Sequence, residues 1–198
     1  MRKDRTARWL ALGAVAAGLA VTLWFAVLDP RAEDVPTVGQ GDYRLETTEG
    51  APFTAATLTG RPSAIFFGYT HCPDVCPTTL GDIAFWQQEL GDRAAAMRFF
   101  LVTVDPERDT IPVLADYLSW SEGITGVTGT EAEIAKALEA FRIYAQKVPG
   151  EGADYSMDHS ASVLLFDAEG RFAGRIGYQE PVETVLPKLR ALIPGGDE

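Results

Sequence analysis

The sequence predicts an α/β fold in which helices cover both faces of a mixed central sheet. Short apolar runs typical of buried strands alternate with longer segments suited to helices, and this alternation favours parallel pairing of the strands. Near the C-terminus, two apolar runs flank the four-residue loop 167–170, which predicts an antiparallel β-hairpin. Parallel strands with an added hairpin make the expected sheet mixed.

Each expected element has a local signature. Strands are expected at residues 64–68, 98–104, 162–166 and 172–176, where aromatic and branched apolar residues cluster. Helices are expected at residues 77–90, 112–120, 130–144 and 181–193. Pro77 suits the first position of a helix, where its missing N–H costs nothing. Thr130 and Glu133 have the spacing of a capping box.

Length and composition fit one globular domain with an additional segment. The chain has 198 residues, of which 46% are hydrophobic and 23% charged. Its net charge is −11. This charge argues against a nucleic-acid partner, because binding phosphates needs a basic face to neutralise them.

The N-terminus predicts a membrane anchor. Residues 9–28 carry no charge, and a helix of that length spans ~30 Å, about the apolar thickness of a bilayer. Basic residues dominate residues 1–8, which places them in the cytoplasm and the rest of the chain outside. The alternatives are a buried soluble helix or a cleaved signal peptide with its small-residue site at 18–20, although the apolar run continues past that point.

A polar tether and one domain follow the expected anchor. Residues 29–40 (DPRAEDVPTVGQ) contain two prolines and predict a short, extended linker. The folded domain is therefore expected over residues 41–198.

The only two cysteines, Cys72 and Cys76, lie between the first predicted strand and the following helix. Binding groups collect at this end of the strands in open α/β sheets. A helix start stabilises negative charge, which lowers a thiol pKa. Two thiols on one side of a helix start either close a disulfide or bind a soft metal. Two inert buried cysteines and a purely structural disulfide are the alternatives.

His159 is the candidate third ligand. It precedes the strand expected at 162–166, and this position would lie beside Cys72 and Cys76 if that strand neighbours 64–68. Structural zinc sites usually have four protein ligands, whereas Cu(I) accepts fewer, so two thiolates and one imidazole favour copper. An ordinary capped histidine is the alternative.

Three further residues near these ligands have two interpretations each. His71 is expected to point away from Cys72 in an extended segment. Met157 offers a soft thioether, but a packing role under the loop is the favoured interpretation. Asp158 could orient the ring of His159 or could simply cap the loop.

Four segments together resemble the Sco/SenC family of copper proteins over residues 38–195. They are residues 68–78 (GYTHCPDVCPT), 104–110 (VDPERDT), 124–129 (ITGVTG) and 158–160 (DHS). The chain departs from the family pattern at Ile111, which is an extra residue before a proline. This variation affects no expected ligand.

The resemblance implies a thioredoxin-like fold that binds one copper ion, Cu(I) or Cu(II), through Cys72, Cys76 and His159. It also implies a copper chaperone that assembles the copper site of cytochrome c oxidase subunit II, with other periplasmic copper chaperones as further partners. The anchor would be a single-pass span of a bacterial inner membrane, with the domain facing the periplasm. In the second motif, Arg108 and Asp109 could form a partner surface, but a turn after the strand is favoured.

Other functions use the same residues. A thiol–disulfide oxidoreductase acting on the oxidase subunit would use Cys72 and Cys76 as a redox pair. However, three residues separate them where the redox motif has two, and His159 lies where thioredoxins place a proline. A thiol peroxidase would need threonine at the position of Pro73. A copper or redox sensor is a third alternative. The expectation is a metallochaperone rather than an enzyme, with thiol reductase activity left open.

Overall fold

The structure is a computed structural model that describes residues 38–150 and 154–193. The expected cytoplasmic segment 1–8, the anchor 9–28 and most of the linker 29–40 lie outside these residues. Within the two described ranges, no helix has both the length and the apolar character needed to cross a bilayer.

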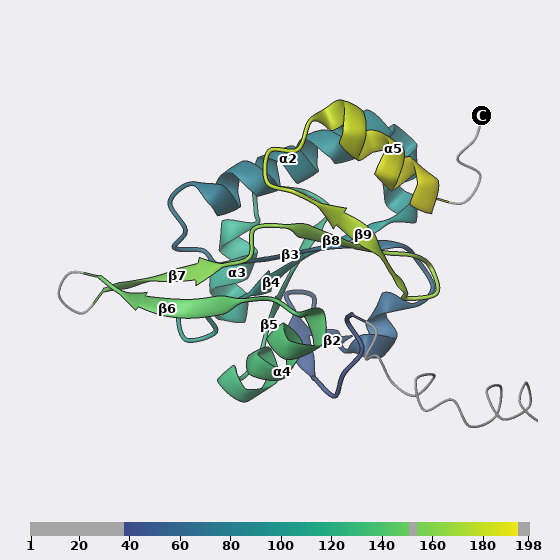
Figure 1. The fold of residues 1–198 in the computed structure, drawn as a ribbon. Helices are drawn as coiled ribbons and strands as arrows, with labels where there is room; N and C mark the ends of the chain where they lie inside the picture. The colour runs from purple at the N-terminus through teal and green to yellow at the C-terminus, as the bar shows by residue number, and fades with distance from the viewer. Residues whose placement is uncertain (1–37, 151–153, 194–198) are drawn as a thin grey trace, which may run out of the picture. The chain divides into compact units, whose positions relative to one another are not determined.

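A seven-stranded mixed sheet forms the centre of the domain (Figure 1). Its strands are β1 (Leu45–Thr47), β2 (Pro52–Phe53), β3 (Ser63–Gly68), β4 (Arg98–Thr103), β5 (Ile124–Thr128), β8 (Val163–Phe166) and β9 (Phe172–Ile176). They lie in the order β2-β1-β5-β4-β3-β8-β9. The central β3, β4 and β5 are parallel, and the remaining pairs are antiparallel.

Helices cover both faces of this sheet. They are α2 (Val75–Leu90), α3 (Ile111–Tyr117), α4 (Glu131–Phe141) and α5 (Val182–Leu192), with short 3₁₀ turns at Ala55–Leu58 and Gly91–Ala96. Figure 1 shows α2 and α5 packed together on one face and α4 on the other. This arrangement confirms the predicted α/β class and its thioredoxin-like layering.

The core surrounds β3, the most enclosed strand. All six of its residues are buried because it pairs with β4 and β8 and has helices on both faces. A strand buried on both faces needs a continuous apolar run rather than alternation, which is what the sequence provides. Phe67 continues the core towards α4, where its ring lies 5.1 Å from that of Phe141.

A separate antiparallel hairpin is formed by β6 (Ala145–Pro149) and β7 (Tyr155–His159), which extends away from the main sheet (Figure 1). Its side chains alternate. Tyr155, Met157 and His159 are partly buried, whereas Ser156 and Asp158 are exposed. The β7 strand therefore turns every second side chain towards the domain.

Within the residues that the structure describes, every strand and helix predicted for the domain is present, with ends shifted by a few residues, and five strands were not predicted. The missed strands are β1, β2, β5, β6 and β7. The helix expected at 130–144 ends at Phe141, because Arg142 adopts a left-handed conformation (φ 56°) and β6 begins at Ala145. The Thr130 hydroxyl accepts a hydrogen bond from the Glu133 amide, as predicted for the helix cap.

Candidate metal centre

The two cysteines lie at the carboxyl end of β3. Cys72 is half-buried in the loop after the strand, and Cys76 is fully buried in the first turn of α2. The helix begins at Val75, two residues earlier than expected, so the amide of Cys76 is one of the unpaired donors of the helix start. This amide donates to the Cys72 sulfur at 3.3 Å. The Cys72 sulfur therefore lies at the start of α2.

The Cys76 thiol does not have the lowered pKa that is expected at a helix start. Burial raises the pKa of its thiol strongly, and the neighbouring Cys72 adds to this effect. The prediction that the helix start would lower the thiol pKa is wrong for Cys76, because desolvation of the thiolate outweighs the amide dipoles. In the metal-free protein Cys76 is a neutral thiol at neutral pH.

Gly68 leaves room for the Cys76 sulfur. A Cβ atom at this position would lie 3.0 Å from Cys76 Sγ and 2.9 Å from the ring of Phe66. Both contacts are closer than normal packing allows. The glycine that ends β3 is therefore part of the architecture of the thiol pair.

His159 completes the cluster from the end of β7. Its Nε2 lies 3.6 Å from Cys76 Sγ, and its Nδ1 lies 3.0 Å from the carbonyl oxygen of Ser160. With the proton on Nδ1 donated to that carbonyl, Nε2 keeps a free lone pair directed at the thiols. Burial lowers the pKa of the imidazole, which favours the neutral, ligating form. Its orienting partner is the Ser160 backbone rather than Asp158, which is exposed.

The ligand atoms of Cys72, Cys76 and His159 all lie within 4.8 Å of one another. Metal–sulfur and metal–nitrogen bonds of about 2.0–2.3 Å place three ligands of one ion roughly 4 Å apart, so this set fits a single soft ion. Sheet topology explains the convergence. Phe66 near the end of β3 pairs with Val163 at the start of β8, which brings the segments after β3 and before β8 to one edge. The predicted meeting of these segments is confirmed.

Two aromatic rings enclose the imidazole. The ring of Tyr69 meets His159 edge-on at a centroid distance of 5.8 Å, and the ring of Phe66 lies at 6.2 Å. This apolar wall keeps water from the ring and explains its lowered pKa.

The other residues considered from the sequence lie outside the cluster. His71 is exposed, and its Nδ1 lies 3.0 Å from the hydroxyl of Thr70. Met157 packs against the hydrophobic core, which agrees with the favoured packing role.

The segment 105–109 forms the predicted turn. The carbonyl of Asp105 accepts hydrogen bonds from the amides of Arg108 and Asp109. Both aspartates are buried, so Asp109 offers no surface to a partner.

The buried carboxylate of Asp109 ties the cysteine loop to the sheet, a role that its sequence motif did not indicate. Asp109 accepts hydrogen bonds from the Thr70 amide (3.1 Å), the Thr70 hydroxyl (2.6 Å) and the Thr103 hydroxyl (2.7 Å). Thr103 ends β4, and Thr70 precedes the cysteines by two residues. The carboxylate therefore fixes the start of the loop that carries both thiols. Thirty-nine residues separate Thr70 from Asp109, and no local pattern links them.

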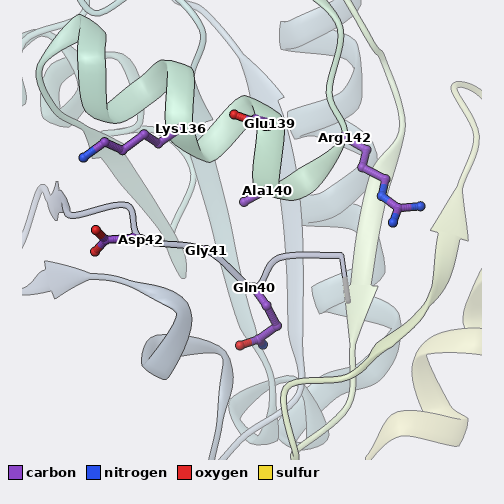
Figure 2. Close-up of a pocket in the computed structure, with 7 residues that line it drawn as sticks. All are labelled: Gln40, Gly41, Asp42, Lys136, Glu139, Ala140 and Arg142. Atoms are coloured by element: carbon purple, nitrogen blue, oxygen red, sulfur yellow. The ribbon is translucent and has the colours of Figure 1, made fainter. Parts of the chain in front are cut away.

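A cavity of about 580 Å³ lies elsewhere, between residues 40–42 and α4 (Figure 2). Its lining consists of Gln40, Gly41, Asp42, Lys136, Glu139, Ala140 and Arg142. The charged groups there are of both signs, and no member of the thiol–imidazole cluster contributes to it. The cavity therefore does not bear on the metal chemistry.

Known proteins are similar to this chain in both sequence and fold. A family model described as SCO1/SenC matches residues 31–194. The chain is 35% identical over 167 residues to "Protein SCO1, mitochondrial" of Saccharomyces cerevisiae, covering 80% of this chain and 56% of that protein. It is 32% identical over 168 residues to the "SCO2-like protein" of Rickettsia felis, covering 78% and 82% of the two chains. The structure of Bradyrhizobium japonicum ScoI with copper bound matches with a TM-score of 0.73 and 39% identity, over 79% of this chain and 99% of that one. The chain spans little more than half the length of the yeast protein.

Proposed function

Because the chain belongs to the SCO1/SenC family, we propose that it is a membrane-anchored copper chaperone for cytochrome c oxidase. Its cargo would be one copper ion bound by Cys72, Cys76 and His159. The observation that carries the proposal is that the ligand atoms of two thiols and one imidazole lie within 4.8 Å of one another. Cys72 and His159 are 87 residues apart in the sequence. The copper-bound Bradyrhizobium relative supports copper as the ion.

Each ligand has a defined task in this proposal. The Cys76 thiol is protonated before binding, so loading with copper releases its proton. Cys72 is the more accessible sulfur and would be the first to share the ion with thiolates of an acceptor. His159 contributes a neutral nitrogen, which is a weaker anchor for a soft ion than thiolate and favours release.

The family resemblance supports a proposal for the acceptor and the location. We propose the copper site of oxidase subunit II as the acceptor, with other periplasmic copper chaperones as donors. The apolar segment 9–28 would hold the domain on the outer side of a bacterial inner membrane. Confinement to the membrane of the acceptor would raise the effective concentration of the two partners.

The proposal is tested by measuring the number of copper ions that the full-length chain binds. The chain, purified in detergent and fully reduced without oxygen, would be titrated with Cu(I), desalted and analysed for metal. We expect one copper per chain, lost in Cys72→Ser and Cys76→Ser and strongly reduced in His159→Ala. His71→Ala is the matched control, because this exposed imidazole is outside the cluster. Equal retention by wild type and all three ligand variants would overturn the site.

A second candidate function rests on the unequal exposure of the two thiols. Cys72 is half-buried and accepts an amide hydrogen bond, whereas Cys76 is fully buried behind it. This pair could reduce a disulfide of the oxidase subunit. The Cys72 thiolate would attack one sulfur of that disulfide and release the other as a thiolate. Cys76, losing its proton, would then attack the Cys72 sulfur of the mixed disulfide, and the second partner sulfur would leave and take up a proton. The partner gains two thiols and this chain gains a disulfide.

Mixing with an acceptor separates the two functions. The copper-loaded chain and the metal-free dithiol would each be mixed with an oxidase subunit II domain, in its reduced and its disulfide form respectively. Copper transfer without disulfide exchange supports the chaperone, and exchange without transfer supports the reductant. A copper or redox sensor would do neither.

A further inference from the structure

The three candidate ligands belong to two separate sheets, so their relative position depends on contacts between these sheets. Cys72 and Cys76 follow β3 of the main sheet, whereas His159 ends β7 of the two-stranded hairpin. We propose that Arg108 is the positioning residue that holds this hairpin against the domain and keeps His159 facing the thiols. The inference rests on the copper-binding function proposed above.

Arg108 binds the hairpin and the domain at once. Its Nε donates to the carboxylate of Asp105, which is buried two residues after the end of β4. Its Nη1 donates to the backbone carbonyl of Tyr155 on β7 at 3.1 Å. The guanidinium carbon also lies 3.7 Å from the centroid of the Tyr155 ring. One side chain therefore makes an ion pair with the domain and both a hydrogen bond and a cation–π contact with the hairpin.

The same residues close a ring of contacts. The hydroxyl of Tyr155 donates to Asp105 Oδ1 at 2.8 Å, while Arg108 binds Oδ2 of that carboxylate. Asp105 is thus satisfied from both sides, and each member of the trio contacts the other two. Such a network loses more than one interaction when a single member is removed.

Arg108 affects the position of the imidazole through two sets of contacts. Tyr155, Met157 and His159 alternate along β7 and face the domain together, so fixing Tyr155 fixes the face on which His159 lies. In addition, Arg108 lies 5.8 Å from the centroid of the Tyr69 ring, and that ring meets His159 edge-on. Loss of the guanidinium would loosen both the strand and the aromatic wall of the imidazole.

Geometry favours this role over a partner surface. The Arg108 side chain is only 18% exposed, and its Nε and Nη1 donors are used within the chain, on Asp105, on the Tyr155 carbonyl and, at 3.4 Å, on the exposed Asp154. A cation outside the hairpin provides a control. Lys136 on α4 pairs with Glu133, and its side chain is 50% exposed. An exposed pair of this kind contributes little to a structure in water. Lys147 is unsuitable as a control, because its Nζ also lies 4.0 Å from the centroid of the Tyr155 ring.

The first measurement uses the metal-free full-length chain in detergent. Hydrogen–deuterium exchange would be followed in Arg108→Gln and Lys136→Gln. We expect Arg108→Gln to speed exchange in residues 155–159 and leave residues 63–68 unchanged, and we expect Lys136→Gln to match wild type in residues 155–159. Unchanged exchange of residues 155–159 in Arg108→Gln would overturn the proposal. This readout needs no copper, so it stands even if the proposed function fails.

The second measurement is Cu(I) affinity by competition with a chromophoric chelator, in wild-type and His159→Ala backgrounds. We expect Arg108→Gln to weaken binding about 10- to 100-fold, the range typical of residues that orient a metal ligand. Arg108→Lys should restore part of the loss, since it keeps the charge without the planar fork. In the His159→Ala background, Arg108→Gln should have no further effect. An equal loss in both backgrounds would show that Arg108 does not act through His159. If Arg108→Gln fails to fold, Tyr155→Phe and Arg108→Lys supply the same comparison.

Discussion

The two halves of the candidate metal site are built differently. The cysteine half belongs to the most enclosed part of the domain: β3 is buried along its length, and Asp109 ties the following loop to β4 through Thr70. The histidine half is a two-stranded hairpin whose outer face is exposed. Isolated hairpins are marginally stable, so the place of β7 depends on side-chain contacts with the domain. The site thus combines two fixed thiols with one ligand that is easier to move.

This difference leads to separate expectations for the two halves. Substitutions in the cysteine half should change the free energy of unfolding of the whole domain, because they disturb its core. Substitutions in the histidine half should change local opening of the hairpin and metal affinity, with a smaller effect on global unfolding. A site of this kind would release an ion by loosening the imidazole first while both sulfurs stay in place.

The largest effect is expected from Asp109→Ala in the cysteine half. The change removes the acceptor of three hydrogen bonds. It leaves the Thr70 amide and the buried Thr103 hydroxyl without an acceptor, whereas the half-buried Thr70 hydroxyl keeps its contact with His71. Each such group costs about 1–3 kcal/mol, so we expect a loss of about 3 kcal/mol or more in the free energy of unfolding. Urea unfolding of the metal-free chain measures it.

Asp109→Asn is the control for this prediction. It keeps one acceptor oxygen and the shape of the side chain, and the threonine hydroxyls can turn to accept from its amide. We expect a clearly smaller loss than for alanine. If alanine and asparagine destabilise equally, or if neither does, the loop is not held by this carboxylate.

Gly68→Ala is expected to have the next largest effect. The added methyl group would press against Cys76 Sγ and Phe66 in a fully packed strand, which costs about 1–3 kcal/mol in global stability. It should also displace the buried sulfur and weaken copper binding. Gly81→Ala is the control, since nothing lies within 4 Å of the added carbon on α2. There the same change should stabilise the protein by up to ~1 kcal/mol. Similar unfolding midpoints for the two variants would contradict the close packing at Gly68.

The cysteine half could be predicted from the sequence because its information is local. An apolar run, two cysteines and a helix follow one another within residues 64–90, so strand, ligands and helix could be placed together. The position of His159 beside them required the pairing of β3 with β8, which the sequence only suggested and the family resemblance supported.

The histidine half was harder because its strands lack an apolar signature. Four of the five residues of β6 are exposed, and β7 alternates in burial with only Tyr155 and Met157 as large apolar side chains. Their conformation depends on long-range contacts such as Arg108 with Tyr155, 47 residues apart. The end of α4 was missed for a similar reason: residues 142–144 follow a helical pattern, but the chain must turn there to enter the hairpin.

Tyr155→Phe is a milder change in the histidine half. It removes the hydroxyl that donates to Asp105 and keeps the ring under the guanidinium of Arg108. We expect a loss of about 1 kcal/mol, confined to opening of the hairpin. Hydrogen exchange of residues 155–159 should rise while that of β3 and β4 stays constant. A uniform rise over all strands would mean that the hairpin and the main sheet unfold as one unit, which would remove the contrast between the two halves.

The smallest expected effect is the contribution of His159 to the pH dependence of the free energy of unfolding. Burial lowers the pKa of its imidazole below the ordinary value of 6.5, so between these two values the unfolded chain binds more protons than the folded one. Stability of the metal-free domain should therefore fall as the pH drops below about 6.5. His159→Gln should remove this contribution, and the difference between the two unfolding profiles isolates it. Glu180, whose pKa Lys188 lowers from 4.5 to about 2, loses its contribution only at more acidic pH and is common to both proteins. A wild-type profile that stays parallel to that of His159→Gln between pH 7 and 5 would show that the imidazole is as hydrated as in the unfolded chain, and the hairpin would then stand open in the absence of metal.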